Sequence, residues 1–457
     1  MKKDEIVELD IVSYGKDGEG VAKLNDFVVF VPGCLVGEKI KAQIILVKKN
    51  FAVGRVIKIV VPSKDRVTPF CPIFFKCGGC DMQHVSYEYQ LKVKRENVKN
   101  CIDKATGLNV SVDEVVHGDK LFGYRNKVQV PIRRIKNIAY AGFYKEGTHT
   151  FVPFVKSENL DLGDCPLHTR QMQNIIDVVV NYINEYNIST YDEVSNKGLI
   201  RHLVLRRVNE SYSICLVING EGIFKQNKLI DALKKLNISF ALYVSKNLKQ
   251  TNVIMGDSVE CIYGEENIKG EALDVEYTVN PNSFLQINDE IRDAIYSKVN
   301  QIISTTKDAI VYDVFSGIGI MSNMFAKYAK EVISIEIVKE AIEDAKKIAV
   351  KNNNKNIKNI CGDAAIELPK VIKGNSIIVI DPPRKGCSDR VINSIIESKA
   401  NKIIYISCNP ATLARDIKLL IENYDIVSVT PYDMFPQTKH VESVVLLEIK
   451  KPLDEKK

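Results

Sequence analysis

The sequence predicts an α/β protein built from three parts: a small N-terminal antiparallel β-barrel, a mixed α+β middle part and a C-terminal doubly wound sheet. Two observations carry this prediction. With 457 residues, the chain is too long for a single hydrophobic core. Short strands with frequent turns fill its first sixty residues, whereas after Pro281 apolar strands alternate with helical segments, which is the pattern of a largely parallel, doubly wound sheet.

The composition is that of an ordinary soluble protein, with 45% hydrophobic and 26% charged residues, which excludes a disordered or collagen-like chain. Residues 1–10 lack the apolar region of a secretion signal, and no segment reaches the ~18 uninterrupted apolar residues of a membrane span. We therefore expect a cytoplasmic protein without a membrane partner. The net charge of +6 permits binding to nucleic acid but does not require it.

The N-terminal segment reads as short strands separated by turns. These strands are predicted over residues 7–14, 21–23, 27–31 and 39–48. Evenly spaced short strands are typical of a small barrel. From residue 39 onward the segment is basic, with Phe51 inside the run, and its cations are Lys39, Lys41, Lys48, Lys49, Arg55 and Lys58. Such a run is either a solvated sheet face or, on a barrel of the oligonucleotide-binding type, a groove that follows phosphates.

The middle part combines helical and strand patterns. Residues 87–106 have helical composition, residues 171–186 predict a second helix, and residues 123–264 otherwise alternate as strands. The first helix carries a basic stripe made of Lys92, Lys94, Arg95, Lys99 and Lys104. Further cations recur at Arg125, Lys127, Arg133, Arg134, Arg201, Arg206 and Arg207. Each cluster alone fits a solvated face, but together they suggest a long track for a polyanion.

The C-terminal part alternates β and α. Strands are predicted over residues 309–315, 332–337, 357–361, 377–380, 402–407, 426–430 and 443–449. In such a sheet, ligands bind outside the carboxyl ends of the strands. The first strand ends in Asp313 and the glycine pair Gly317 and Gly319, which permits close approach of the backbone to a nucleoside cofactor, while the third glycine of the dinucleotide fingerprint is absent.

Polar groups follow the later strands of this sheet as well. Glu336 is placed to accept hydrogen bonds from ribose hydroxyls, and Asp363 from an adenine amino group, although either acid alone could be a helix N-cap. Asp381 precedes two prolines, which fix the chain at the mouth of the sheet. Cys408 precedes a helix, whose N-terminus is expected to lower the thiol pKa. His440 and Glu442, before the last strand, are both candidate bases.

The chain has eleven cysteines, an odd number without a secretion signal, which favours metal or catalytic use over disulfides. Cys71, Cys77 and Cys80 lie within ten residues around paired glycines, and Cys165 can join them from a distant loop. Four thiolates suit either an iron–sulfur cluster or a structural zinc ion. Spacing alone does not decide between these two.

Four short motifs together carry a family resemblance. They are Asp381-Pro382-Pro383-Arg384, Ser407-Cys408-Asn409-Pro410, His440-Val441-Glu442 and Gln286-Ile287-Asn288. In this combination the chain resembles the RNA uracil-C5 methyltransferases over nearly its whole length. The basic barrel resembles the TRAM domain of the 23S rRNA (uracil-5-)-methyltransferase type, and the four cysteines resemble those that hold the [4Fe-4S] cluster of that type. The C-terminal sheet is then a Rossmann-like S-adenosylmethionine methyltransferase sheet.

The resemblance implies roles for single residues. Cys408 would be the nucleophile that adds to uracil C6, and Glu442 the base that removes the C5 proton. The cofactor and target pocket would be lined by Gln286, Phe315, Glu336, Asp363 and Asp381. Cys71, Cys77, Cys80 and Cys165 would hold the [4Fe-4S] cluster, which is expected to be structural because methylation with S-adenosylmethionine needs no electron transfer.

The resemblance also implies partners and boundaries. We expect RNA as the substrate, 23S rRNA before tRNA, and no obligate protein partner. The expected domains are residues 1–61, residues 62–280 with the cluster, and residues 281–457, with helical segment 87–106 able to pack on the catalytic domain. Two rivals are a non-catalytic RNA-binding or RNA-remodelling protein, which leaves Cys408 and Glu442 unexplained, and a small-molecule methyltransferase, which leaves the barrel and the basic clusters unexplained.

Overall fold

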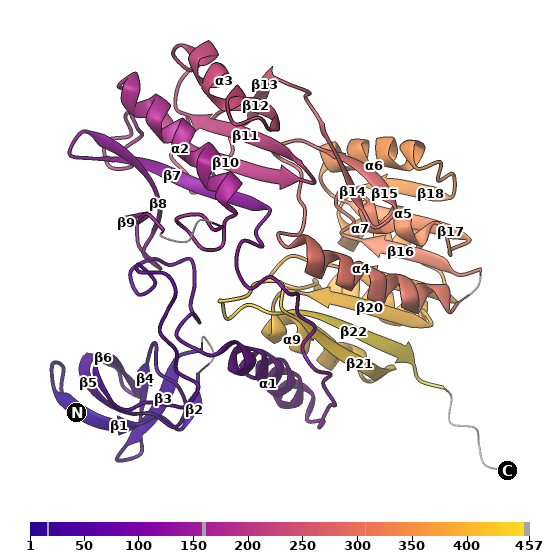
Figure 1. Cartoon of the computed structure of the whole chain (residues 1–457). Helices are drawn as coiled ribbons and strands as arrows, with labels where there is room; N and C mark the ends of the chain where they lie inside the picture. The colour runs from indigo at the N-terminus through magenta and orange to yellow at the C-terminus, as the bar shows by residue number, and fades with distance from the viewer. Residues whose placement is uncertain (16–17, 158–160, 307, 452–457) are drawn as a thin grey trace. The chain divides into compact units, whose positions relative to one another are not determined.

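A computed structural model describes residues 1–15, 18–157, 161–306 and 308–451. The chain forms two compact units (Figure 1). The first contains Met1–Lys94, Tyr144–Thr150 and Phe435–Lys439, and the second contains Arg95–Phe143, Phe151–Met434 and His440 onward. None of the helices in the described part of the chain is both long and apolar enough to cross a membrane.

The first unit is built on a six-stranded barrel sheet with the order β1-β5-β6-β4-β3-β2. Its strands are β1 (Ile6–Asp10), β2 (Ser13–Tyr14), β3 (Gly20–Leu24), β4 (Phe27–Val31), β5 (Lys39–Val47) and β6 (Phe51–Val61). The predicted strands are present, but the sequence analysis did not identify β6. The barrel is also not wholly antiparallel, because β4 and β6 pair in parallel. Alternate residues such as Ile40, Ala42 and Ile44 point into its core.

The rest of the first unit is held by contacts between segments that lie far apart in sequence. The cysteine-rich loop contacts residues 144–150 through a hydrogen bond from the Gly78 amide to the Tyr144 carbonyl, 3.0 Å. The Met82 amide donates to the Gln437 carbonyl, 3.0 Å. Gln437 also accepts a side-chain hydrogen bond from Gln90, on the first half of α1 (Tyr87–Thr106).

The second unit begins with a seven-stranded mixed sheet, ordered β13-β12-β11-β10-β7-β8-β9. Its strands are β7 (Lys127–Ile135), β8 (Ile138–Tyr144), β9 (Phe151–Pro153), β10 (Ile200–Val208), β11 (Ser211–Ile218), β12 (Ser239–Lys246) and β13 (Ser258–Tyr263). Helices α2 (Arg170–Glu185) and α3 (Gln226–Lys234) cover one face, over a core that includes Ile176, Leu203 and Leu233 (Figure 1). A hairpin of β14 (Ile268–Ala272) and β15 (Val275–Val279) follows.

The C-terminal sheet of this unit has seven strands in the order β18-β17-β16-β19-β20-β22-β21. Its strands are β16 (Ile310–Val314), β17 (Glu331–Glu336), β18 (Ile357–Cys361), β19 (Ser376–Ile380), β20 (Lys402–Ser407), β21 (Tyr424–Tyr432) and β22 (Glu442–Ile449). The first five are parallel, whereas β22 runs antiparallel between β20 and β21. This confirms the predicted doubly wound α/β fold.

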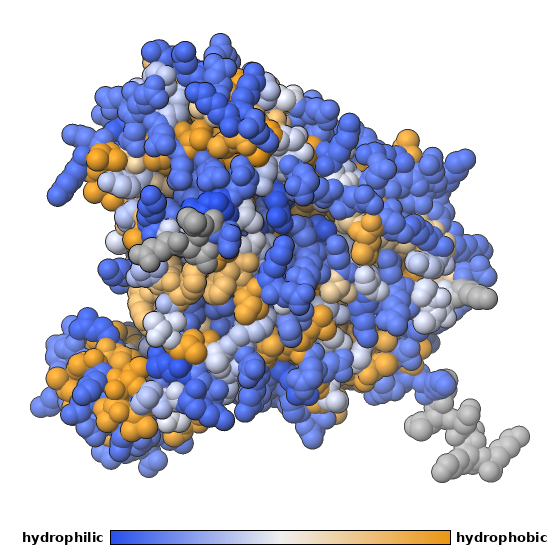
Figure 2. Space-filling model, in the orientation of Figure 1, coloured by the Kyte–Doolittle hydropathy of each residue, from blue (hydrophilic) through white to orange (hydrophobic). Residues whose placement is uncertain are grey.

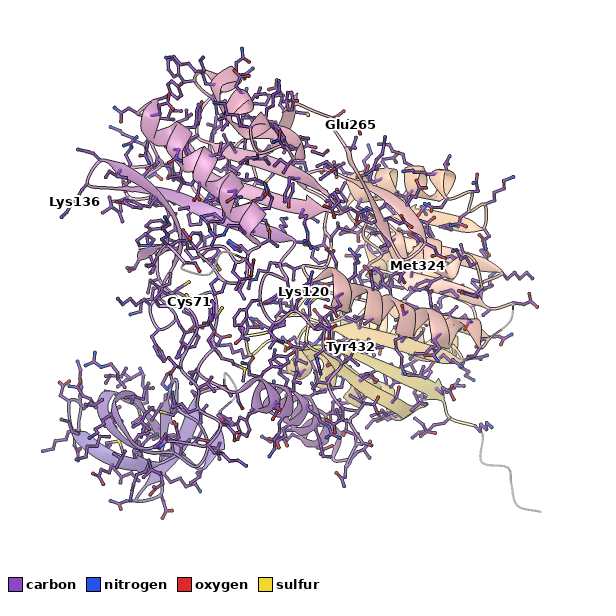
Figure 3. The ribbon with its side chains drawn as sticks, in the orientation of Figure 1. Cys71, Lys120, Lys136, Glu265, Met324 and Tyr432 are labelled. Carbon is purple, nitrogen blue, oxygen red and sulfur yellow. The ribbon has the colours of Figure 1, made fainter. Side chains whose placement is uncertain are left out.

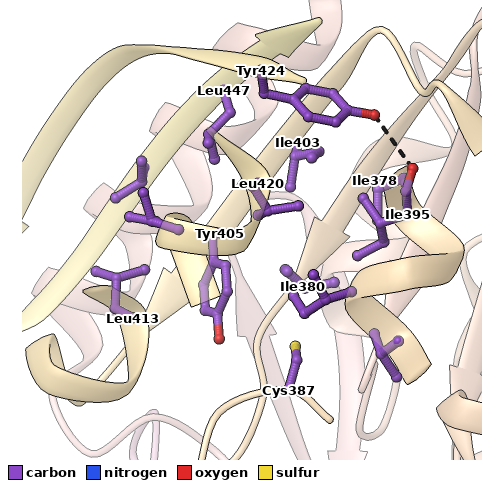
Figure 4. Packing of buried hydrophobic residues seen from close by; sticks show 14 of the residues in the cluster. Ile378, Ile380, Cys387, Ile395, Ile403, Tyr405, Leu413, Leu420, Tyr424 and Leu447 are labelled. Carbon is purple, nitrogen blue, oxygen red and sulfur yellow. Dashed lines mark hydrogen bonds between the residues drawn. The ribbon is translucent and has the colours of Figure 1, made fainter. Parts of the chain in front are cut away.

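Six helices belong to this sheet. They are α4 (Asp289–Ser304), α5 (Ile320–Phe325), α6 (Lys339–Lys351), α7 (Ala364–Val371), α8 (Asp389–Ser398) and α9 (Pro410–Leu420). Ile378, Ile395, Ile403 and Leu420 are among the apolar residues that join α8 and α9 to the strands (Figure 4). Val98 and Ile102, on the second half of α1, belong to the same core. Two-sided burial explains why these strands read as continuous apolar runs.

Candidate active site

One edge of the C-terminal sheet collects the residues that the sequence analysis singled out. Because β16 to β20 are parallel, their carboxyl ends lie at the same edge. The residues at or directly after these ends are Phe315, Glu336, Asp363, Asp381 and Cys408. Glu442 joins them because β22 is antiparallel, so that this strand begins where the others end.

Cys408 and Glu442 lie at the ends of two adjacent, paired strands, β20 and β22. The last paired residues of β20 and β22 are Ser407 and Ser443, and one further step along both chains brings Cys408 opposite Glu442. Directly opposite residues of an antiparallel pair point to the same face, with Cβ atoms about 5 Å apart. The two groups also interact electrostatically. A thiol and a carboxyl group therefore lie side by side at the edge of the sheet.

The pKa of the Cys408 thiol is not lowered, contrary to the sequence-based expectation. Burial and the carboxylates of Glu442 and Asp381 together raise it to about 11, although the Arg384 guanidinium acts in the opposite direction. The helix α9 does start directly after Cys408, with Asn409 as its N-cap. Burial and two neighbouring acids outweigh this helix terminus, so the protonated form of the thiol is favoured.

Three carboxyl groups of this sheet have raised pKa values. Burial, with a contribution from Asp381, raises the pKa of Glu442 well above its usual value, and only 4% of this residue is exposed. Burial and Asp313 raise the pKa of Asp381 to about 7, and burial raises that of Asp313 to about 6. Asp313 accepts a hydrogen bond from the Ser322 hydroxyl, 2.5 Å. Carboxyl groups with pKa values close to neutrality suit proton transfer.

The turn after β16 has a strained backbone. Phe315 has φ of 67°, a left-handed conformation that a bulky residue seldom adopts, and Gly317 and Gly319 have φ of 56° and 77°. A Cβ atom on Gly319 would lie 3.0 Å from Ala345, whereas one on Gly317 would meet no atom within 4 Å. The backbone at Gly317 is therefore open on one side, which suits a ligand lying against it.

Glu336 and Asp363 both contact the backbone in the structure. Glu336 accepts from the amides of Gly317 and Val338, at 3.0 and 2.9 Å. Asp363 caps α7 by accepting from the Ala365 amide, 2.9 Å. The N-cap considered in the sequence analysis is thus what the structure shows for Asp363, and Glu336 fixes the glycine turn.

The loop after Asp381 is held by a residue that the sequence analysis did not identify. Asp416, on α9 and 1% exposed, accepts from the Cys387 amide at 2.8 Å and from the Tyr405 hydroxyl at 2.6 Å. Arg415 pairs with Asp416 and donates to the Cys387 carbonyl, 3.0 Å. Cys387 and Tyr405 lie in the buried core in Figure 4. The one sequence feature that could have identified this residue is its place, as an aspartate among apolar residues, on the helix that follows Cys408.

Gln286 lies on the segment before α4, which the middle sheet holds by its main chain. Asn126 donates to the Gln286 carbonyl, 2.9 Å, and Arg206 donates to the Ser283 carbonyl, 2.6 Å. Phe284 lies between Ser283 and Gln286 in the sequence, and it is 70% exposed. The sequence analysis did not single out this aromatic residue.

The four candidate metal-binding cysteines are divided between the two units: Cys71, which Figure 3 labels, belongs to the first with Cys77 and Cys80, and Cys165 belongs to the second. All four have intermediate exposure. The Cys71 and Cys77 thiols interact electrostatically, and the Cys77 sulfur accepts from the Gly79 amide, 3.4 Å. Across the described residues, no three His, Cys, Asp or Glu side chains gather as a metal site. Four cysteine thiolates are suitable ligands for a [4Fe-4S] cluster, but the structure does not bring these side chains together as a metal site.

Most cations of the polyanion track predicted for the middle part bond within the fold. Arg201 donates to the carbonyls of Asn247 and Lys249, Arg134 donates to that of Ile188, and Arg133 pairs with Glu193. Arg207 pairs with Asp289, 3.4 Å. Lys127 has its pKa lowered to about 8 by burial and by Arg206. These cations hold the fold together instead of presenting a charged surface.

Three residues of the basic stripe on α1 have the same explanation, whereas Lys92 and Lys104 are exposed. Lys94 is buried and donates to the Phe435 carbonyl, 3.1 Å. Arg95 donates to the Val112 carbonyl, and Lys99 bonds to Asp103. The barrel differs, because all six of its basic side chains from Lys39 to Lys58 are exposed.

The strand order, the glycine turn and the acids at the carboxyl ends of the strands define the class as an S-adenosylmethionine-dependent methyltransferase. Residues 366–450 match the family model of the tRNA (uracil-5-)-methyltransferases, and residues 3–57 match the TRAM domain. A protein from Clostridium tetani named as an RNA methyltransferase is 35% identical, covering 98% of this chain and 97% of its own length. One from Caldanaerobacter subterraneus is 38% identical, covering 98% and 99%.

Among solved structures, the tRNA (uracil-54, C5)-methyltransferase of Pyrococcus abyssi, in complex with S-adenosyl-L-homocysteine, is similar over 96% of this chain and 100% of its own. The TM-score is 0.77 and the sequence identity 28%. The chain therefore belongs to the RNA (uracil-5-)-methyltransferase family, with a TRAM domain at its N-terminal end and S-adenosylmethionine as the methyl donor.

Proposed function

We propose that the protein methylates C5 of uridine in RNA, with Cys408 as the nucleophile and Glu442 as the base. The observation that carries this proposal is the placement of the two residues opposite each other at the ends of β20 and β22. A thiol and a carboxyl group side by side can act in turn on adjacent atoms of one pyrimidine ring, and both are within reach of the same base.

The chemistry explains the need for both groups. C5 of uracil is a poor nucleophile, so the Cys408 thiolate first adds to C6 and makes C5 nucleophilic. S-adenosylmethionine supplies the methyl group. Glu442 then removes the C5 proton, and elimination breaks the bond between Cys408 and C6. The raised pKa of Glu442 makes its carboxylate a stronger base than an exposed glutamate.

The raised pKa of Cys408 gives Arg384 a role in the first step. A thiol with a pKa of about 11 contains little thiolate at neutral pH. Arg384 is the cation that lowers the pKa of both Cys408 and Glu442. We assign to it the stabilisation of the anions at the edge of the sheet, which favours thiolate formation when the base is bound.

The cofactor would lie against the open side of Gly317, beside Glu336, Asp363 and Phe315. Glu336 is fixed by the Gly317 and Val338 amides, so its carboxylate is positioned for ribose hydroxyls. Asp363 would approach the adenine from the next strand. Gln286 and Asp381 would contact the target uracil, which must leave its stack to reach Cys408.

Mechanism-based trapping tests the assignment. Glu442→Gln should leave Cys408 able to attack and the methyl group able to move, while elimination stops. We expect a covalent protein–RNA adduct that survives denaturing electrophoresis after incubation with RNA and S-adenosylmethionine. Cys408→Ala should abolish turnover, leave S-adenosylmethionine binding within a few fold, and remove the adduct from the double variant. Normal methylation by Cys408→Ala would disprove the mechanism.

His440→Gln is the control for the base. His440 lies two residues before Glu442 and outside β22, which begins at Glu442. An adduct with Glu442→Gln alone would support the proposal. An adduct with His440→Gln alone would transfer the role to the imidazole, and an adduct with neither would mean that another group removes the proton.

As for the RNA substrate, we propose 23S rRNA before tRNA. Support comes from the TRAM match over residues 3–57 together with the cysteine-rich segment. We propose domain boundaries of residues 1–61, 62–280 and 281–457. The similar Pyrococcus abyssi enzyme is named for tRNA, so tRNA is the alternative. Mapping 5-methyluridine in both RNA classes from a strain that lacks this gene decides the question, since only the true substrate loses the modification.

We also propose that Cys71, Cys77, Cys80 and Cys165 hold a [4Fe-4S] cluster with a structural role. The amide of Gly79 donates to the Cys77 sulfur, a type of hydrogen bond that also tunes cluster thiolates. Protein purified without oxygen should be brown and contain about four irons per chain. Cys165→Ser should lose the metal, whereas Cys361→Ser, at an exposed thiol elsewhere, should keep it. One zinc and no iron would contradict the proposal.

A further inference from the structure

An exposed aromatic residue in the first unit has no role in the catalytic chemistry. Phe75, within the cysteine-rich loop, is 69% exposed. Among the described phenylalanines only Phe75, Phe224 and Phe284 are more than half exposed. Phe284 lies beside Gln286 in the active-site segment, and Phe224 has the Lys225 ammonium 5.1 Å from its ring centre. Phe75 remains to be explained.

The ring of Phe75 is held in place although it is exposed. It packs against Phe74 in an edge-to-face arrangement, with ring centres 4.7 Å apart at 66°. His84 lies on the same side, 6.1 Å away. Phe74 and His84 are themselves buried, at 6% and 5% exposure. The buried pair therefore supports the ring from one side and leaves the rest of it in solvent, so little side-chain freedom would be lost on binding.

The surroundings of Phe75 within this unit are basic. Its ring approaches the Gly33 turn of the barrel, where a Cβ atom would lie 3.9 Å from Phe75 Cε1. The Gly33 carbonyl accepts from Arg66, 2.7 Å, so the turn adjoins the segment that follows β6. Lys64 and Lys76, on the segment after β6 and on the cysteine-rich loop, are both exposed. A rigid aromatic face near exposed ammonium groups is the arrangement with which proteins bind single-stranded nucleic acid.

We propose that Phe75 is a stacking platform for an unpaired base of the RNA substrate, with the neighbouring lysines contacting the adjacent phosphates. The inference rests on RNA being the substrate. It extends the proposed function by naming a binding site for a second nucleotide, separate from the uracil at Cys408. An aromatic face stacks on any base, so this site would contribute affinity without reading sequence.

The chain contains no tryptophan, which allows a direct test on the full-length protein. Phe75→Trp and, as a matched control, Phe224→Trp each give a protein with one tryptophan. The probes are a short single-stranded oligouridylate and unmodified rRNA and tRNA transcripts. Stacking should quench the emission of Phe75→Trp at saturating RNA, whereas Phe224→Trp should keep its emission.

The affinity measurement uses Phe75→Leu, which keeps an apolar side chain and removes the ring. We expect RNA binding to weaken by about 5-fold or more while S-adenosylmethionine binding stays unchanged. Unquenched emission, or wild-type affinity of Phe75→Leu, would overturn the proposal, and altered self-association instead would assign the ring to a second copy of the chain. If the wild-type protein methylates no RNA, the proposed function fails separately from this inference.

Discussion

The barrel and the middle sheet carry similar numbers of basic residues and use them in opposite ways. In the barrel, Lys48, Lys49 and Lys58 are exposed on strand ends and outer faces, where hydrophilic and hydrophobic patches share the surface (Figure 2). In the middle sheet, Arg206 is 2% exposed and donates to the Ser283 carbonyl. An exposed cation keeps its counterions and can exchange them for phosphates. A buried cation needs a partner in the fold.

The comparison shows that a basic sequence cluster does not identify an RNA-binding surface. Arg133 and Arg134 look like Lys48 and Lys49 in the sequence, yet both arginines donate to backbone carbonyls. Arginine is suited to this role because its fork reaches two acceptors at once. We therefore assign the electrostatic attraction of RNA to the exposed cations of the barrel.

The largest expected effect is on RNA affinity. Replacing Lys39, Lys48, Lys49 and Lys58 together by Gln should weaken RNA binding roughly 10- to 1000-fold at moderate salt, because each phosphate contact on a single strand contributes a slope of about 0.7 in log affinity against log salt. Stability should change by less than about 0.5 kcal/mol, since the side chains are exposed. Filter binding at several salt concentrations measures this. An unchanged salt slope would refute the assignment.

The second prediction concerns stability. Arg206→Ala should destabilise the second unit by about 2–4 kcal/mol, because it removes the bond to Ser283 and leaves a cavity. Arg206→Met fills more of that space and should cost less. The matched control is Arg55→Ala in the barrel, where the arginine is exposed and bonds to Gln43; we expect less than about 0.5 kcal/mol. Denaturant unfolding measures all three, and equal losses at positions 206 and 55 would break the comparison.

The third prediction concerns Arg384, an exposed cation that acts on a half-buried thiol. Arg384→Gln should raise the pKa of Cys408 and slow its alkylation at pH 8, and Glu442→Gln should lower that pKa and speed alkylation, each by about 10-fold per pKa unit. The pH profile of iodoacetamide labelling at Cys408 measures both. Shifts in the same direction would mean that charge is not the cause.

The smallest effect is expected from Asp381→Asn. The pKa of Asp381 is raised to about 7 by burial and by Asp313, so its protonated form is favoured in the fold. This favourable contribution is complete below the unfolded pKa near 4 and is lost as the pH rises through about 7. Asp381→Asn should therefore raise the melting temperature by a few degrees at pH 8 and by less at pH 5. Scanning calorimetry at the two pH values measures this, and an equal gain at both would contradict it.

Sequence reasoning predicted the architecture because hydrophobic patterning depends on local periodicity. The apolar strands β16, β19 and β20 are buried on both faces, and each ends near its predicted boundary. It also singled out Cys408 and Asp381, because residues that follow parallel strands meet at one edge. Glu442 was singled out because it precedes the last strand, which the structure shows to be antiparallel. The strand β6 was missed because Gly54, Arg55 and Lys58 interrupt its apolar pattern.

What the sequence could not predict depends on contacts between distant segments. The pKa of Cys408 is set by burial and by Glu442 and Asp381, none of which a helix start beside the thiol reveals. Asp416 acts on Cys387 and Tyr405 through tertiary hydrogen bonds. Arg201 is buried because it donates hydrogen bonds to the carbonyls of Asn247 and Lys249, which lie more than forty positions further along the chain. Such pairings are fixed by topology.

The insertion of β22 between β20 and β21 has a consequence for the timing of folding. Glu442 reaches Cys408 only when this final strand pairs with β20, whereas the glycine turn at Gly317 and its partner Glu336 belong to strands made much earlier. A growing chain that stops before β22 can assemble much of the edge proposed to bind the cofactor, but it lacks Glu442, the proposed base, beside the thiol. During synthesis the proposed base therefore reaches the thiol only after residues 442–449 have left the ribosome and paired with β20.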